Sequence, residues 1–257
     1  MTKLNIEEYK NNIYHDAVRY DDEHWWKKDD IEFWKQMLDE SSGKKVLELA
    51  AGTGRLAIPL IRNGGKYSGI EISPEFTQRA NKKIKDQYFD GTVHLGDIRD
   101  FNLNEKFDLI FIGFNSFLHM LKDSDAAACL KCVHKHMDKN SRFMIDIFRP
   151  DPLFLYRPEG MRFPTMEYIE TKTNDLINVE ESNDYDPETG INKIRWYYSR
   201  PDKKDERIYD FTMRMYWPDT INRLLIDAGF RITSVWGNYE KAEFDEGSNL
   251  HIYTVGI

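Results

Sequence analysis

The sequence predicts an α/β fold in which a parallel sheet covered by helices is interrupted, late in the chain, by an inserted antiparallel sheet. A short apolar run at residues 46–49 leads into a glycine turn and then into a helical pattern. Beyond Pro150, runs of alternating apolar and polar residues become dominant. The chain has 257 residues, 40% of them hydrophobic, which is enough for one large core or one core with an appended subdomain.

The first strand and its turn form a corner that suits a nucleotide. Val46, Leu47 and Leu49 make an apolar run typical of a strand that is covered on both faces. Gly52 and Gly54 follow, and glycine both permits backbone angles that a side chain forbids and lets a ligand approach the main chain. The next helix is expected to end at Gly64 and Gly65. Its apolar stripe consists of Leu56, Ala57, Leu60 and Ile61.

The second strand is expected from Tyr67 to Ile72 and carries an acid near its end. Glu71 lies nineteen residues after Gly52, where such folds place the acid that binds ribose hydroxyls. The sequence therefore predicts a cofactor that contains adenosine.

Two classes of cofactor use such a corner, and Gly52, Gly54 and Ala57 satisfy the dinucleotide spacing as well. Glu48 favours a methyl-donor cofactor over a dinucleotide. Its carboxylate lies inside the apolar strand, where it would repel a diphosphate but attract the sulfonium and ammonium groups of S-adenosylmethionine (SAM). The alternative is a structural Glu48, paired with a core cation or placed at a strand end.

The stretch from Lys44 to Arg149 resembles class I SAM-dependent methyltransferases. The resemblance rests on four motifs in order: the glycine turn, Glu71, His94-Leu95-Gly96-Asp97-Ile98, and the strand Phe107–Ile112 followed by Phe114-Asn115-Ser116-Phe117. It implies SAM as the cofactor and a Rossmann-like, mostly parallel sheet of seven strands with helices on both faces.

The resemblance also implies a cofactor site. Glu48 to Gly54 would surround the methionine end, with Ala50 where a fuller pattern often has glycine. Glu71 would bind the ribose, and Asp97-Ile98 the adenine. The full set is Tyr14, Glu48, Ala50, Gly52, Gly54, Glu71, Ile72, Asp97, Ile98 and Asn115.

Catalysis of methyl transfer is chiefly alignment, so acid–base help is secondary and is needed only for a protonated acceptor. His119, just past the fourth strand, is the candidate base, with a backbone-paired histidine at a helix start as the alternative. Tyr14 is the second catalytic candidate, because related small-molecule enzymes place a tyrosine from this region over the methionine end. Either residue could instead be structural.

The late part of the chain is expected to form the insertion. Its candidate strands are Tyr168–Thr173, Leu176–Tyr185, Ile191–Ser199 and Arg207–Tyr216, with a hairpin turn at 186–190. The chain then returns to the core through a helix at Pro218–Ala228 and strands at Phe230–Trp236 and Leu250–Val255.

We accordingly expect three parts. Residues 1–40 would form an N-terminal helical lid, and residues 41–150 and 217–257 the SAM-binding core. Residues 151–216 would form the antiparallel insertion and build the acceptor pocket, because ligands bind beyond the carboxyl ends of parallel strands.

The composition of the chain bears on which classes of partner the protein can bind. The net charge of −8 and the absence of a Lys/Arg cluster argue against a nucleic acid, as does Phe114-Asn115-Ser116-Phe117 in place of Asn-Pro-Pro-Tyr. No segment is apolar enough to span a membrane or act as a signal, so a cytoplasmic protein is expected, as a monomer or homodimer. Cys129 and Cys132 have no second pair, and no metal site is expected.

The leading hypothesis is a methyltransferase that acts on the nitrogen or oxygen of a small molecule, similar to bacterial amino-sugar or glycine-type N-methyltransferases. A protein that binds SAM without catalysis is a second hypothesis. An NAD-dependent oxidoreductase is a third, which Glu48 and the lack of a recognisable hydride-transfer constellation disfavour.

Overall fold

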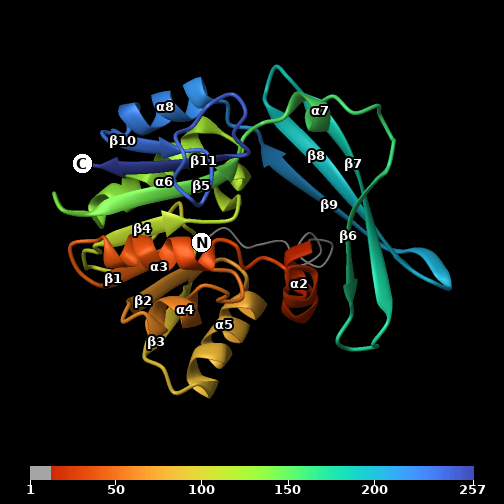
Figure 1. Ribbon diagram of the computed structural model, residues 1–257, viewed down its shortest axis with the longest axis horizontal. Helices are drawn as coiled ribbons and strands as arrows, with labels where there is room; N and C mark the ends of the chain where they lie inside the picture. The colour runs from red at the N-terminus through yellow and green to blue at the C-terminus, as the bar shows by residue number, and fades with distance from the viewer. Residues whose placement is uncertain (1–12) are drawn as a thin grey trace. The chain divides into compact units, whose positions relative to one another are not determined.

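The computed structural model describes residues 13–257. They divide into two compact units, each with its own sheet (Figure 1). The parallel-sheet unit comprises residues 28–149 and 216–257, and the antiparallel-sheet unit comprises residues 13–27 and 150–215. The part of the expected lid that precedes Ile13 lies outside the described residues.

The parallel-sheet unit is built on seven strands in the order β10-β11-β5-β4-β1-β2-β3. Their bounds are β1 Lys45–Leu49, β2 Lys66–Glu71, β3 Gly91–Leu95, β4 Leu109–Ile112, β5 Arg142–Phe148, β10 Arg231–Trp236 and β11 Leu250–Gly256. Strands β3, β2, β1, β4 and β5 pair in parallel, whereas β11 is antiparallel to both β5 and β10. This order confirms the predicted Rossmann-like, mostly parallel sheet.

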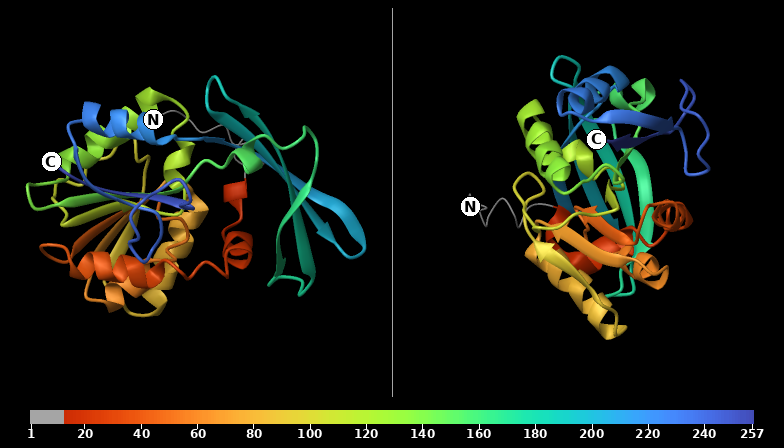
Figure 2. Two further views of the ribbon diagram at one scale, coloured as in Figure 1. Left: turned by 45° about the horizontal axis from the view of Figure 1, so that its top comes forward. Right: turned by 90° about the vertical axis from the view of Figure 1, so that its left-hand side faces the viewer.

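Helices cover both faces of this sheet. One face carries α3 (Ile31–Asp39), α4 (Ala57–Arg62) and α5 (Pro74–Asp86), and the other carries α6 (Asp123–Lys135) and α8 (Pro218–Asp227) (Figure 2). A short 3₁₀ helix, η2 (Ser116–His119), follows β4. The strands are apolar on both faces because both are covered; for example, the buried Trp34 ring of α3 stacks on Phe111 of β4 with ring centroids 4.2 Å apart.

The antiparallel-sheet unit contains four strands in the order β6-β7-β8-β9. They are β6 Phe163–Ile169, β7 Leu176–Asp186, β8 Ile191–Arg200 and β9 Lys203–Arg214, accompanied by η1 Ile13–His15, α2 Ala17–Glu23 and α7 Pro152–Leu155. One sheet face forms a core that includes Ile177, Ile194 and Phe211, together with Ile13 of η1. The expected turn between β7 and β8 is present, with Gly190 at a φ of 72°.

The first strand of this sheet does not lie where the sequence analysis put it. The prediction was Tyr168–Thr173, whereas β6 runs from Phe163 to Ile169. Pro164 is tolerated because β6 is an edge strand whose register shifts between Pro164 and Met166. Beyond Ile169 the chain turns, and Asn174 there has a φ of 61°.

Within residues 13–257, no helix combines the length and apolarity that a membrane span requires.

Candidate functional site

The turn after β1 places three residues in the left-handed backbone region. Ala50, Gly52 and Gly54 have φ angles of 57°, 56° and 75°. A Cβ added to Gly52 would meet no atom within 4 Å, whereas one added to Gly54 would lie 2.9 Å from the Ala80 Cβ of α5. Gly52 therefore borders open space, and Gly54 allows α5 to approach. The positive φ of Ala50 is a strained conformation for a residue with a side chain and costs roughly 1 kcal/mol.

Glu71 ties the end of β2 to this turn. Its buried carboxylate accepts hydrogen bonds from the backbone N–H of Gly52 and that of Ser73, each at 2.8 Å. Burial raises the pKa of Glu71, and these backbone donors oppose the rise. Two apolar side chains at the ends of neighbouring strands are exposed, Ile72 at 45% and Leu95 at 60%. A buried acid beside exposed apolar surface suits an adenosine, and the predicted ribose contact of Glu71 stays a prediction.

Glu48 lies on β1 with its carboxylate buried. The Tyr67 hydroxyl donates a hydrogen bond to Glu48 Oε2 at 2.6 Å. Burial is the main cause that raises the pKa of Glu48 to about 8, which the Tyr67 hydrogen bond and the Arg55 charge partly offset. Across residues 13–257, no lysine, arginine or histidine forms an ion pair with Glu48, so the core-cation alternative finds no support there.

An ion pair that the sequence analysis missed borders the same turn. The Arg55 guanidinium, directly after Gly54, donates to both carboxylate oxygens of Asp30 at 2.6 and 2.7 Å. Asp30 is fully buried at the start of α3. Arg55 also lies over the Phe114 ring, 5.6 Å from its centroid. The sequence shows Arg55 as a charged residue next to Gly54, but no local pattern indicates that Asp30 is its partner.

The corner after β4 is held by β5. Phe114 and Asn115 both have positive φ, 49° and 65°. The buried Asp146 carboxylate accepts hydrogen bonds from the Phe114 N–H at 3.0 Å and the Tyr239 hydroxyl at 2.9 Å. Asn115 Oδ1 accepts from the Phe148 N–H at 2.7 Å. The Asn115 amide oxygen, expected in the cofactor site, therefore also fixes the backbone of this corner.

The remaining candidates have different surroundings. Asp97 accepts hydrogen bonds from the Arg99 side chain at 2.6–3.1 Å, which hold its pKa low against the effect of burial. Ile98 is buried, and half-buried His119 is the last residue of η2. Tyr14 lies in η1, in the antiparallel-sheet unit, with its ring 6.1 Å from that of Tyr20. Every other candidate cofactor residue belongs to the parallel-sheet unit.

His251 on β11 was not singled out from the sequence. It is fully buried opposite Ile147 of β5, and neither ring nitrogen has a hydrogen-bond partner among the described residues. Burial and the nearby Arg149 charge lower its pKa to about 4, so the ring is neutral at pH 7. The only signal in the sequence was a polar residue within an apolar strand.

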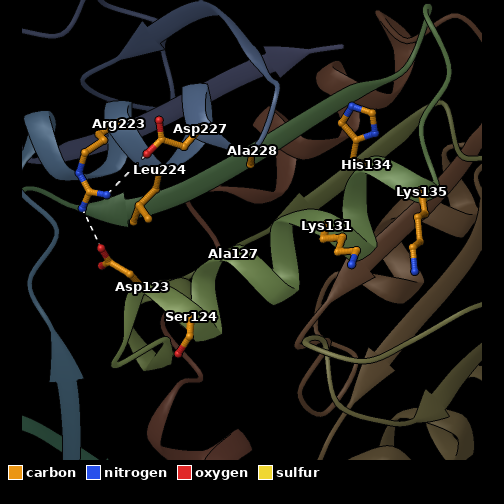
Figure 3. A pocket seen from close by; sticks show the side chains of 10 residues that line it. All are labelled: Asp123, Ser124, Ala127, Lys131, His134, Lys135, Arg223, Leu224, Asp227 and Ala228. Carbon is orange, nitrogen blue, oxygen red and sulfur yellow. Dashed lines mark hydrogen bonds and ion pairs between the residues drawn. The ribbon is translucent and has the colours of Figure 1, made fainter.

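A separate groove of about 690 Å³ lies between α6 and α8 (Figure 3). Arg223 of α8 forms an ion pair across it to Asp123 of α6 at 2.9 Å, and another within α8 to Asp227 at 3.7 Å. None of the candidate cofactor residues lines this groove, so it is distinct from the glycine turn. In the part of the chain that the structure describes, no three His, Cys, Asp or Glu side chains cluster as metal ligands.

The residues at the glycine turn fit SAM. Open space at Gly52, the Glu71 carboxylate and the exposed Ile72 and Leu95 side chains suit its adenosine, and the acid group of Glu48 suits its cationic end. The fold and these residues together are those expected of a SAM-dependent enzyme with a Rossmann-like core.

Residues 46–140 match a protein-family model described as a methyltransferase domain. A glycine/sarcosine N-methyltransferase from Aphanothece halophytica is 26% identical over 226 residues, which cover 86% of this chain and 79% of that relative. A dTDP-3-amino-3,4,6-trideoxy-alpha-D-glucopyranose N,N-dimethyltransferase from Streptomyces venezuelae is 26% identical over 101 residues, 39% of this chain and 41% of the relative. The solved CcbJ methyltransferase from Streptomyces caelestis has a TM-score of 0.80 at 18% identity and covers 97% of both chains. Residues 46–140 are thus a methyltransferase domain, and the matches over the rest of the chain support a SAM-dependent methyltransferase.

Proposed function

We propose that the protein transfers the methyl group of SAM to the nitrogen of a small-molecule amine. The observation that carries this proposal is the match to the glycine/sarcosine N-methyltransferase. Its aligned residues cover 86% of the chain and so reach into both sheets, whereas the amino-sugar dimethyltransferase matches only 39%. We therefore favour a small amine as the acceptor. From its composition we further propose that the protein is a cytoplasmic monomer or homodimer that does not act on nucleic acid or membranes.

The proposed cofactor site follows the strand ends. Glu48 and the turn from Ala50 to Gly54 take the methionine end, with Tyr14 and Asn115. Glu71 and Ile72 take the ribose, and Asp97 and Ile98 take the adenine. The hydrogen bonds from Gly52 and Ser73 support the role of Glu71, because they fix its carboxylate at the turn while a carboxylate oxygen can accept more than one donor.

The acceptor nitrogen must be presented to the methyl group of SAM in a reactive form. SAM supplies a methyl group on a sulfonium, which is an excellent leaving group. The protein has to hold the acceptor nitrogen in line and unprotonated, and we assign His119 as the proton acceptor, with Tyr14 as the second catalytic candidate. Residues 151–216 would build the acceptor pocket. Of the expected lid at residues 1–40, the part from Ile31 to Asp39 is α3 and packs on the parallel sheet, so the proposed lid ends before Lys28.

Cofactor binding is tested by calorimetric titration with SAM, comparing the wild type with Glu71→Ala. We expect at least a tenfold loss of affinity, because the carboxylate would lose its ribose contact. Glu246→Ala is the matched control, since Glu246 is exposed in the loop between β10 and β11 and should bind SAM normally. Equal affinities in all three proteins would contradict the proposed site.

The acceptor is tested by incubating the enzyme with SAM and paired compounds. Glycine, sarcosine and amino sugars would be compared with analogues in which a hydroxyl replaces the amine, and S-adenosylhomocysteine formation would be followed by mass spectrometry. Turnover with amines alone supports nitrogen as the acceptor atom. Turnover with the hydroxyl analogues alone would reject it.

A further inference from the structure

The Glu48 carboxyl group is buried, and none of the cations among residues 13–257 forms an ion pair with it. It lies on β1 between Gly69 of β2 and Phe111 of β4, and its hydrogen-bond donor is the uncharged hydroxyl of Tyr67 at 2.6 Å. An ionised carboxylate in such a place lacks the countercharge that water or a cation would supply.

The nearby charges are mostly of the same sign. Asp30 and Glu71 oppose ionisation of Glu48, and Arg55 favours it. Arg55 is already bound through two hydrogen bonds to Asp30, so its charge is largely neutralised by that partner. Of the three acids, Asp30 is the one that the Arg55 guanidinium contacts, and Glu48 forms no ion pair with it.

A proton is the simplest countercharge for this carboxylate when no ligand is bound. The group is neutral at pH 7, in agreement with its pKa of about 8. In this form Tyr67 can still donate to the carboxyl group, so the hydrogen bond survives protonation.

We propose that SAM binding exchanges this proton for the positively charged end of the ligand. The carboxylic acid O–H bond of Glu48 breaks, the proton passes to the buffer, and the resulting carboxylate becomes the counterion of the bound cation. Glu48 thus distinguishes ligands by charge and makes cofactor affinity depend on pH. The inference rests on the proposed placement of Glu48 at the methionine end of SAM.

The proton is counted by titrating the protein with SAM at pH 7 in buffers of different ionisation enthalpy, such as phosphate, imidazole and Tris. The slope of the observed enthalpy against the buffer enthalpy gives the protons released. We expect about 0.8 proton per SAM, the difference at pH 7 between a group of pKa about 8 and the same group shifted to about 6 by the bound cation. 5′-Methylthioadenosine, which shares the adenosine but lacks both cationic groups, should release none.

Glu48→Gln is the decisive variant, because glutamine copies the shape of the protonated acid and can still accept from Tyr67. We expect the number of protons that this variant releases on SAM binding to fall close to zero. Glu246→Gln, on the exposed loop, should release as many protons as the wild type. Subtracting the variant from the wild type also removes any proton exchanged by the ligand itself.

A second measurement covers the case in which Glu48→Gln fails to fold. The SAM affinity of the wild type should rise up to tenfold from pH 6 to pH 7 and level off above pH 8, while the methylthioadenosine affinity stays flat. Undiminished release in Glu48→Gln, or flat SAM affinity in the wild type, would overturn the proton exchange. Failure of SAM to bind the wild type at any pH would instead remove the cofactor placement on which the inference depends.

Discussion

The Tyr239 hydroxyl donates a hydrogen bond to the Asp146 carboxylate at 2.9 Å, joining the loop between β10 and β11 to the carboxyl half of β5. The same carboxylate oxygen accepts the Phe114 N–H of the corner after β4. One buried acid thus connects two loops at the edge of the sheet where the glycine turn also lies. Two consecutive non-glycine residues with positive φ are held at that corner, a conformation that surrounding contacts must maintain.

Tyr239→Phe should loosen this corner. Removing a hydrogen bond to a buried charged group costs about 1.5–3 kcal/mol, so we expect the free energy of unfolding in urea to fall by that amount. Because the Phe114 corner borders the site, kcat should fall more than the affinity for SAM. Tyr88→Phe is the control, since Tyr88 is 97% exposed and should change neither quantity. An unchanged stability of Tyr239→Phe would show that the hydroxyl bond contributes nothing.

Arg55→Met should be strongly destabilising, because it leaves the fully buried Asp30 carboxylate without its cation. Breaking a buried pair in this way costs roughly 3–5 kcal/mol. The double variant Asp30→Asn/Arg55→Met removes both charges and should recover part of that loss. Urea unfolding of the two single variants and the double variant gives the coupling energy, and simple additivity would contradict a direct pairing.

The two glycines of the turn should respond differently to alanine. Gly54→Ala places a Cβ 2.9 Å from Ala80 Cβ, and we expect a loss of about 2 kcal/mol or more from overpacking and strain together. Gly52→Ala meets open space, so only the backbone strain of roughly 1 kcal/mol applies to folding, but its methyl group would enter the proposed SAM site. Thermal unfolding and SAM titration of both variants separate these effects. Equal destabilisation with unimpaired SAM binding by Gly52→Ala would contradict this assignment.

Glu48 should make the ligand-free protein less stable as the pH rises. Its pKa is about 8 in the folded protein against 4.5 for an unperturbed glutamate, so between these two values the folded state binds more protons than the unfolded state. Stability therefore falls with increasing pH across this window and becomes level above it. Glu48→Gln lacks this dependence, so its melting temperature should match the wild type near pH 4.5 and exceed it at pH 8.5. A wild-type-minus-variant difference that does not change with pH would contradict the raised pKa.

Much of the parallel-sheet unit could be predicted because its signals are local. The apolar run of β1, Gly52 and Gly54, and Glu71 at the end of β2 lie within one short stretch, and strand and turn chemistry follows from neighbours in the sequence. The structure adds that the Glu71 carboxylate accepts a hydrogen bond from the Gly52 N–H, whereas the ribose contact that the spacing predicted stays a prediction. The four-stranded sheet was also anticipated, although β6 begins five residues before its expected start because an edge strand accommodates Pro164.

By itself, the sequence determined the succession of strands along the parallel-sheet part of the chain, the glycine turn and the acids on β1 and β2, because these depend on residue spacing along the chain. Only the tertiary structure decided the partners of those groups. Arg55 and Asp30 are 25 residues apart, Tyr67 and Glu48 are 19 apart, and Tyr239 and Asp146 are 93 apart. Periodicity carries no information about such pairs, since the sheet topology and helix packing bring them together and burial then fixes their charge.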